Sequence, residues 1–288
     1  MAQYTYDEPT NREDLTDVIT NLSPTETPIT SMIGKTKAKA TYHEFPEDEL
    51  ADAAVNAHVE GEKDVAVAAP ARVRKGNHTQ IMKRGYAVTN SQQAVDKAGV
   101  SDEYAYQMLK AMKELGKDLE LAITTQTKDT AGSKTEARQF AGLPGLIVTN
   151  KVAAGATITM KAISDALQKA WEAGGSPKKL VVSGNNKRAI SALTTSNTKN
   201  IEAAKKKVVE AIDVIDTDFG RVEVVASRFM ADANVFVLDP QYIAVAWLRP
   251  FTKKDLPDDS DGKAGMITGE MTLELRGEKG QAVITVGA

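Results

Sequence analysis

The sequence predicts an α+β fold, in which extended segments and one long helix precede a separate region of mixed helices and strands. One observation is the helical period of apolar residues that runs through positions 102–128. A second is that residues 41–86 contain two extended segments around a polar, alanine-rich middle without a helical period. The third is the alternation of helical and strand patterns at 142–239, which more strands follow.

Residues 1–40 are expected to form an N-terminal arm that carries one short helix. Thr10 and Glu13 fit a capping box, and Ser23 with Pro24 ends the helical pattern. The apolar residues between these signals share one helix face: Leu15, Val18, Ile19 and Leu22. This face needs a partner, and the two alternatives are another subunit and the chain's own domain.

Residues 41–86 are expected to form a long hairpin-like loop whose charges are segregated. The outgoing half is acidic, with Glu44, Glu47, Asp48, Glu49, Asp52, Glu60, Glu62 and Asp64. The returning half is basic, with Arg72, Arg74, Lys75, Lys83 and Arg84. One interpretation is a solvated surface loop. The other is an arm whose complementary charges register a contact with another subunit. We take Glu47, Asp48, Glu49, Arg72, Arg74 and Lys75 as candidate interface residues.

The longest predicted element is a helix at residues 102–128, within a region that spans 87–141. Ser101, Asp102 and Glu103 are a favourable helix start, because they place a hydroxyl and two carboxylates near the positive end of the helix dipole. Such a helix is about 40 Å long. Its expected apolar positions are Ala105, Met108, Leu109, Met112, Leu115, Leu119, Ala122 and Ile123. We interpret its methionines as core residues and not as a cofactor pocket.

A second region is expected at residues 142–240, beginning with a turn at 142–145. Ile163, Ala166, Leu167, Ala170 and Trp171 form one helical stripe, which ends at the breaker sequence 174–177. Positions 180–182 then predict a buried strand. A short helix with Ile190 and Leu193 should follow, capped by Asn185 or Asn186.

The C-terminal half is expected to contain mostly strands. A hairpin is predicted at 208–226, with its turn at 218–220, and strands are predicted at 235–238 and 243–247. Residues 266–276 and 282–286 read as a closing strand pair. The run Lys205 to Lys207 favours a solvated turn over a phosphate site, because no aromatic residue or glycine-rich loop accompanies it.

The composition excludes several classes of function. The chain has 288 residues, no cysteine and a net charge of -3. Disulfides, thiolate metal sites and cysteine nucleophiles are therefore excluded, and a general nucleic-acid-binding role is disfavoured because it needs a basic footprint. The three histidines, His43, His58 and His78, lack the spacing of helical or zinc-finger ligands. No secretory signal or membrane-spanning apolar run is recognised.

No pattern typical of catalysis is present, so we predict no catalytic, cofactor-binding or metal-binding residues and no enzyme activity. The nearest candidate is the strand-to-helix turn at 182–185, because helix N-termini bind anions. The acidic pairs Asp216 with Asp218 and Asp258 with Asp259 are more typical of solvated loops than of cation sites.

Several sequence blocks, kept in one order from the arm to the last strands, resemble the major head proteins of tailed phages with the Hong Kong 97-type capsid fold. The N-terminal blocks are EDLTDVI at 13–19, LSPTETPI at 22–29 with MIG at 32–34, and YHEF at 42–45. The central blocks are GNHTQI at 76–81, QAVDKAG at 93–99 and AWEAGG at 170–175. The last blocks are DFG at 218–220, VFVLDP at 235–240 and AVAWLRPF at 244–251.

This resemblance implies an arm at 1–40, an extended loop at 41–86 and a peripheral domain with a spine helix at 87–141. It further implies an axial domain at 142–240 and returning peripheral strands at 241–288. Many relatives carry an N-terminal scaffolding region that a protease removes, whereas here the arm motif begins at once. We therefore expect scaffolding to be a separate protein or to have already left the chain.

The resemblance also implies the function and partners. The chain should be a major capsid protein, made and assembled in the cytoplasm of a host bacterium and located in the virion shell. It should form hexamers and pentamers with itself, with scaffolding, portal and decoration proteins as further partners, and enclose DNA without reading its sequence. Two rivals remain at this point: an α/β ligand-binding or enzyme domain at 142–239, and a nucleic-acid-binding protein that uses Lys205 to Lys207.

Overall fold

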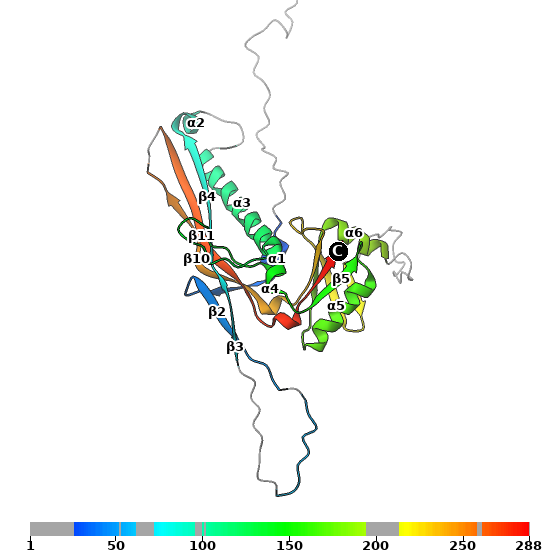
Figure 1. The fold of residues 1–288 in the computed structure, drawn as a ribbon. Coiled ribbons are helices and arrows are strands. Elements are labelled where there is room, and N and C mark those ends of the chain that lie inside the picture. The colour runs from blue at the N-terminus through cyan, green and yellow to red at the C-terminus, as the bar shows by residue number, and fades with distance from the viewer. Residues whose placement is uncertain are drawn as a thin grey trace, which may run out of the picture.

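The computed structural model describes residues 26–51, 53–61, 72–95, 100, 102–193, 213–257 and 261–287. Within them the strands form three sheets (Figure 1). The four-stranded sheet has the order β1 (Gly34–Lys37), β10 (Ile243–Asp255), β11 (Gly262–Leu275) and β4 (Gln80–Thr89). The six-stranded sheet has the order β5 (Lys151–Gly155), β12 (Ala282–Val286), β9 (Asn234–Leu238), β6 (Lys179–Val182), β8 (Gly220–Ala226) and β7 (Val214–Thr217). The third sheet pairs β2 (Tyr42–Glu47) with β3 (Val73–His78).

The predicted long helix is confirmed as α3, Glu103–Thr125, which lies along the four-stranded sheet (Figure 1). The Asp102 carboxylate caps it by accepting a hydrogen bond from the Ala105 amide at 3.1 Å. Leu115 and Leu119 are buried, but Leu109 and Met112 are about half exposed. The core assignment of the last two residues was wrong, because the sequence pattern contains two adjacent apolar stripes and only one of them faces the sheet.

Short helices flank this first layer. They are α1 (Pro28–Met32), α2 (Asn90–Ala94) and α4 (Leu143–Leu146). The buried Glu120 of α3 holds α1 in place: its carboxylate accepts hydrogen bonds from the amides of Ile29 and Thr30 at 2.9 and 2.8 Å. The predicted arm helix, with Leu15, Val18, Ile19 and Leu22, lies outside the described residues, as does Lys205 to Lys207.

The second half of the fold consists of the six-stranded sheet and the helices α5 (Met160–Glu172) and α6 (Gly184–Leu193). The apolar stripe of α5 packs against this sheet as predicted, except that Trp171 is 58% exposed. The expected cap at Asn185 or Asn186 was wrong. Helix α6 begins at Gly184, and the Ser183 hydroxyl accepts a hydrogen bond from the Asn186 amide, because a serine directly before the first turn is already a good cap.

The last two strands, β11 and β12, do not pair with each other, so the expected closing strand pair was wrong. β11 pairs with β10 and β4, whereas β12 pairs with β5 and β9 in the other sheet. The chain changes sheets through the short helix η4 (Glu278–Gly280), and it makes the opposite crossing from β9 to β10 through η3 (Pro240–Tyr242). β12 thus belongs to the six-stranded sheet, although it follows the strands of the other one.

Two further buried glutamates of β11 join segments that are far apart in the sequence. Glu270 accepts hydrogen bonds from Thr79 at 2.7 Å and Arg249 at 3.0 Å, and it also pairs with Arg138. Glu274 accepts one from the Thr36 hydroxyl of β1 at 2.8 Å and lies 3.1 Å from His43 Nε2 of β2. These carboxylates fix β1 and the base of the extended loop to the four-stranded sheet.

Candidate functional site

The extended loop leaves the protein through the antiparallel pair β2–β3, in which Glu47 is opposite Val73 and Phe45 is opposite Lys75. An antiparallel pair lies at the base of the predicted hairpin-like excursion, but the end of the predicted range was wrong: residues 80–86 belong to β4, where Arg84 pairs with Asp118 of α3 at 3.0 Å. The pair lies at one end of the four-stranded sheet, next to the connections that lead to the six-stranded sheet (Figure 1). The base of the loop therefore occupies the junction between the two halves of the fold.

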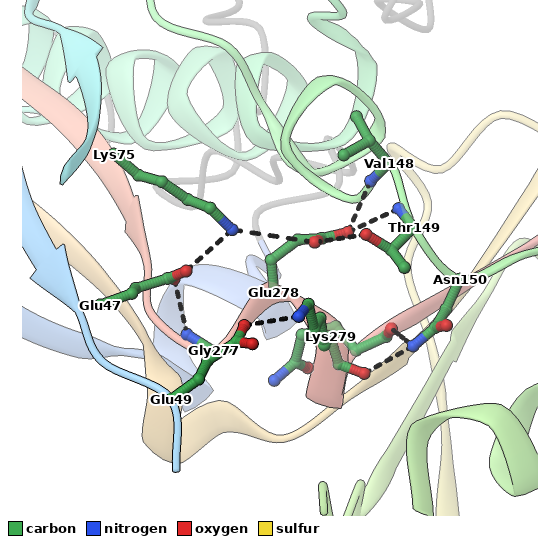
Figure 2. A network of polar contacts seen from close by, with 10 residues as sticks. Glu47, Glu49, Lys75, Val148, Thr149, Asn150, Gly277, Glu278 and Lys279 are labelled. Carbon is green, nitrogen blue, oxygen red and sulfur yellow. Dashed lines mark hydrogen bonds and ion pairs between the residues drawn. The ribbon is translucent and has the colours of Figure 1, made fainter. Parts of the chain in front are cut away.

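Glu278 is at the centre of a polar network at this junction, which we call the loop-root network: Glu47, Glu49, Lys75, Val148, Thr149, Asn150, Gly277, Glu278 and Lys279 (Figure 2). One carboxylate oxygen of Glu278 accepts hydrogen bonds from the amides of Val148 and Thr149 at 2.8 and 2.7 Å. The other oxygen accepts one from the Thr149 hydroxyl at 2.8 Å. Glu278 thereby anchors the connection between α4 and β5.

Lys75 links this anchor to the extended loop. Its Nζ atom lies 2.8 Å from a carboxylate oxygen of Glu47 and 3.8 Å from one of Glu278. Glu47 also accepts a hydrogen bond from the amide of Gly277 at 3.0 Å. Gly277 has a φ of 63°, a left-handed conformation that costs glycine little and that lets the chain turn from β11 into η4.

Lys279 adds a second link, because its Nζ atom lies 2.5 Å from a carboxylate oxygen of Glu49. The Lys279 carbonyl accepts a hydrogen bond from the Asn150 side chain at 2.5 Å, and this same side chain donates to the Gln281 carbonyl at 3.1 Å. The network therefore joins three segments: the loop root, the α4–β5 connection and the β11–β12 connection.

The electrostatics of the network favour the charged forms. Burial would raise the pKa of Glu278, but the hydrogen bonds from Thr149 and Val148 and the charge of Lys75 outweigh it and hold the pKa below its usual value. The hydrogen bond to Glu49 raises the pKa of Lys279. Glu278 and Lys279 are both ionised at neutral pH, so the loop-root network depends on charge pairing.

Two other charge pairs of the loop, one just beyond the β2–β3 pair and one within it, are exposed to solvent. Arg72 lies 2.9 Å from Asp48, with side chains 77% and 56% exposed. Arg74 lies 3.8 Å from Glu44 and is equally exposed to solvent. The acidic and basic halves of the loop thus meet within one chain. The six predicted interface residues lie in β2 or β3 or within two residues of these strands: Glu47, Asp48, Glu49, Arg72, Arg74 and Lys75.

Sequence reasoning found the loop half of this network and missed the other half. Gly277, Glu278 and Lys279 follow Glu47 by 230 residues or more. The direct approach of the β2–β3 pair to the end of β11 brings them near the loop, and no local pattern signals this. The one available signal was the pair Glu278 and Lys279 beside glycines in a turn, which is also typical of solvated turns.

Of the other sites considered from the sequence, those that the structure describes have partners within the chain. At the turn before α6, the Asp232 carboxylate accepts hydrogen bonds from Ser183 and, at 2.8 Å, from Asn185. This helix start already has an anionic partner within the chain. Asp216 pairs with Arg221 at 3.4 Å, and Asp258 with Asp259 lies outside the described residues. In the described part of the chain no group of three His, Cys, Asp or Glu side chains could hold a metal ion.

Comparisons with known proteins identify the family. The family model described as "SU10 major capsid protein" matches residues 2–287. The chain belongs to this family. A major capsid protein of Escherichia phage Phieco32 is 34% identical over 116 residues, which cover 40% of this chain and 33% of that protein. The matched part thus spans about a third of the length of this curated relative.

Solved structures confirm the fold of this SU10-family chain. A subunit from the capsid asymmetric unit of cyanophage A-1(L) has a TM-score of 0.71 at 12% identity, covering 99% of both chains. A chain from the structure of phage G gp27 major capsid proteins and gp26 decoration proteins has a TM-score of 0.60 at 11% identity, covering 100% of both. The fold is the Hong Kong 97-type capsid fold, and the resemblance inferred from the sequence blocks is confirmed.

No helix in the described ranges is both long and apolar enough to span a membrane. The family is one of structural capsid proteins, and the rival α/β enzyme at 142–239 is not favoured. Residues 142–239 do not contain the whole six-stranded sheet, because β12 (Ala282–Val286) lies between β5 and β9 in it.

Proposed function

We propose that this chain is the major capsid protein of a tailed bacteriophage, which assembles with copies of itself into hexamers and pentamers of an icosahedral head. The head encloses double-stranded DNA. The observation that carries this proposal is the family match over residues 2–287, together with a fold that is shared end to end with a phage capsid subunit. The chain acts by self-association and catalyses no reaction.

The geometry of the loop supports this role. Its root is held by a network around the buried Glu278, so the loop projects from a fixed base, while the charges of Arg72, Asp48 and Arg74 remain in solvent. An exposed ion pair contributes only about 0–1 kcal/mol, so exchanging an internal pair for one with a neighbour costs little. Repetition around a closed ring multiplies such small contributions. We assign intersubunit contacts to Glu47, Asp48, Glu49, Arg72, Arg74 and Lys75. Within this set the exposed Asp48, Arg72 and Arg74 contribute mainly to assembly, whereas Glu47 and Lys75 also hold the root within the chain.

The remaining partners follow from the same proposal. Leu15, Val18, Ile19 and Leu22 of the arm contact another subunit, since their apolar face needs cover. Scaffolding and portal proteins are further partners, and a decoration protein is another, as the structure of phage G pairs gp27 capsid proteins with gp26 decoration proteins. The net charge of -3 fits a shell that encloses DNA without binding it specifically. Assembly takes place in the host bacterial cytoplasm, and the product is located in the virion.

Electron microscopy of the purified protein, alone and after co-expression with the scaffolding protein of the same phage, tests the proposal. Closed shells, hexamers or pentamers are the expected result. A protein that stays monomeric in every preparation, at concentrations well above those of a normal lysate, would contradict it.

A further inference from the structure

The outward face of the spine helix α3 carries a stripe of lysines. At 3.6 residues per turn, Lys110, Lys113 and Lys117 lie within about 60° of one another around the helix. The centre of the stripe is about 170° from the buried Leu115 and Leu119, so the stripe points away from the sheet. Lys110 and Lys113 are exposed, and Lys117 is half-buried. The three positions span roughly 10 Å of the helix axis.

No carboxylate in the described part of the chain forms an ion pair with these three lysines. The acidic residues next to them on α3 are Glu114 and Asp118. Both of these pair with Arg84 of β4, at 3.3 and 3.0 Å. Arg84 thus holds the acidic flank of the helix toward the edge of the sheet, and the lysine stripe keeps its positive charge.

The edge strand β1 adds two lysines on the same side of the four-stranded sheet. Lys35 and Lys37 are exposed, and their register partners in β10 are Val245 and Trp247. Residues opposite each other on neighbouring strands point to the same face of a sheet. Val245 is buried in the cluster that contains Leu115 of α3, and Trp247 packs against this cluster. The two lysines therefore lie on the face that α3 covers, and neither has an ion-pair partner among the described residues.

We call these five residues the basic face: Lys35, Lys37, Lys110, Lys113 and Lys117. The chain as a whole has a net charge of -3, so this positive surface is a local concentration. Strands β1 and β4 are the two edges of the four-stranded sheet, about 14 Å apart, and α3 lies mainly against β4. A small anion cannot contact both groups of lysines. The ligand that fits this face is a long polyanion.

Duplex DNA has the required charge density, because it carries one negative charge for about every 1.7 Å of its axis. The residue type also fits the phosphate backbone. Lysine is a point charge on a flexible stem, whereas the planar fork of arginine is the group that commonly reads base edges. The one arginine beside the stripe, Arg84, is already paired within the chain. The basic face is therefore suited to phosphates and not to a base sequence.

We propose that the basic face contacts the phosphate backbone of duplex DNA, which in the shell is the enclosed genome. This inference rests on the proposed function, because the head supplies the DNA. The contact is electrostatic and independent of base sequence. The five lysines of one subunit bind weakly, and repetition over the copies in a shell multiplies their effect. An acidic protein segment is the rival ligand for the same surface.

The salt dependence of DNA binding tests the basic face. The unassembled full-length chain is titrated against a fluorescein-labelled duplex of mixed sequence, and anisotropy gives the association constant between about 50 and 200 mM salt. Neutralisation of five phosphates predicts that this constant falls about 500-fold over the range. In the triple variant Lys110→Gln, Lys113→Gln and Lys117→Gln, two lysines remain, so the fall should be only about 12-fold.

The matched control removes three exposed lysines from the other half of the fold: Lys151→Gln, Lys161→Gln and Lys169→Gln. Both triple variants lose the same charge, and glutamine is as good a helix former as lysine. Thermal unfolding of each variant checks that the fold is retained. The control should keep the salt dependence of the natural chain, because its lysines lie away from the basic face.

The remaining outcomes separate the basic face from the proposed function. Equal salt dependence in the two triple variants would overturn the DNA contact and leave the capsid function standing. Binding of polyglutamate without binding of the duplex, at the lowest salt concentration, would assign the face to an acidic protein segment and also overturn the DNA contact. A natural chain that binds the duplex through the lysine stripe but forms no shell under any condition would support the basic face and contradict the capsid function.

Discussion

The root and the outer part of the extended loop use the same types of charge for different purposes. At the root, Lys75 and Glu47 are partly buried and connect to the buried Glu278. Farther out, Arg72 and Asp48 pair in solvent. Burial makes the difference, because a desolvated charge that loses its partners is costly whereas an exposed pair is worth little. The root charges should stabilise the subunit, and the outer charges should act in assembly.

The largest effect is expected from Glu278→Ala. The change leaves the amides of Val148 and Thr149 without an acceptor and removes a partner of Lys75. We expect the free energy of unfolding of the unassembled chain to fall by about 3 kcal/mol. Urea unfolding followed by circular dichroism measures it, with Glu278→Gln as the matched control that keeps an acceptor. A loss below about 0.5 kcal/mol would show that the network does not hold the junction.

The same carboxylate should give the root a pH dependence. Since the pKa of Glu278 is lower in the folded chain than the unfolded value of about 4.3, the unfolded chain binds more protons in acid. The stabilisation that ionised Glu278 gives the folded chain is fully present above its unfolded-state pKa. It is lost as the pH falls through its lower folded-state pKa. The stability difference between the natural chain and Glu278→Gln should therefore shrink below about pH 4.3. A difference that stays constant from pH 7 to pH 3 would contradict this assignment.

Lys75→Met should have a smaller effect, about 1 kcal/mol, because the side chain is 39% exposed and solvent screens part of its pairing. Methionine keeps most of the aliphatic stem, so the change removes mainly the charge. Combining Lys75→Met with Glu278→Gln tests the coupling: the two losses should be less than additive, since both remove one contact. Full additivity would place the two residues in independent contacts.

Much of the fold followed from local patterns, and the rest depended on pairing between distant segments. The 3.6-residue period of α3 and the breaker sequence after α5 are local, and the structure places both where the sequence predicted them. The change of sheet between β11 and β12 was missed, because their patterns are those of two neighbouring strands and only Val283 and Ile284 pairing with β5 and β9 separates them.

The candidate site divides in the same way. The segregated charges of the loop were visible as two blocks in the sequence. Their partner Glu278 was not, because a single glutamate in a turn is usually solvated, and its burial arises only from the tertiary approach of the α4–β5 connection. The capsid family itself was recognised from blocks such as VFVLDP at 235–240 rather than from physical patterns.

The central claim is that the exposed charges of the loop act in assembly, and the double reversal Arg72→Glu with Arg74→Glu tests it most directly. Shell yield is measured by sedimentation and stability by thermal unfolding of the unassembled chain, each at low and moderate salt. Because both side chains are at least 75% exposed, we expect unfolding to change by less than about 1 kcal/mol while assembly slows or fails. Reversing the contacting carboxylates on the neighbour should partly restore the shells. Normal shell yield from the double reversal at both salt concentrations would contradict the account, and the outer loop would then be a solvated excursion.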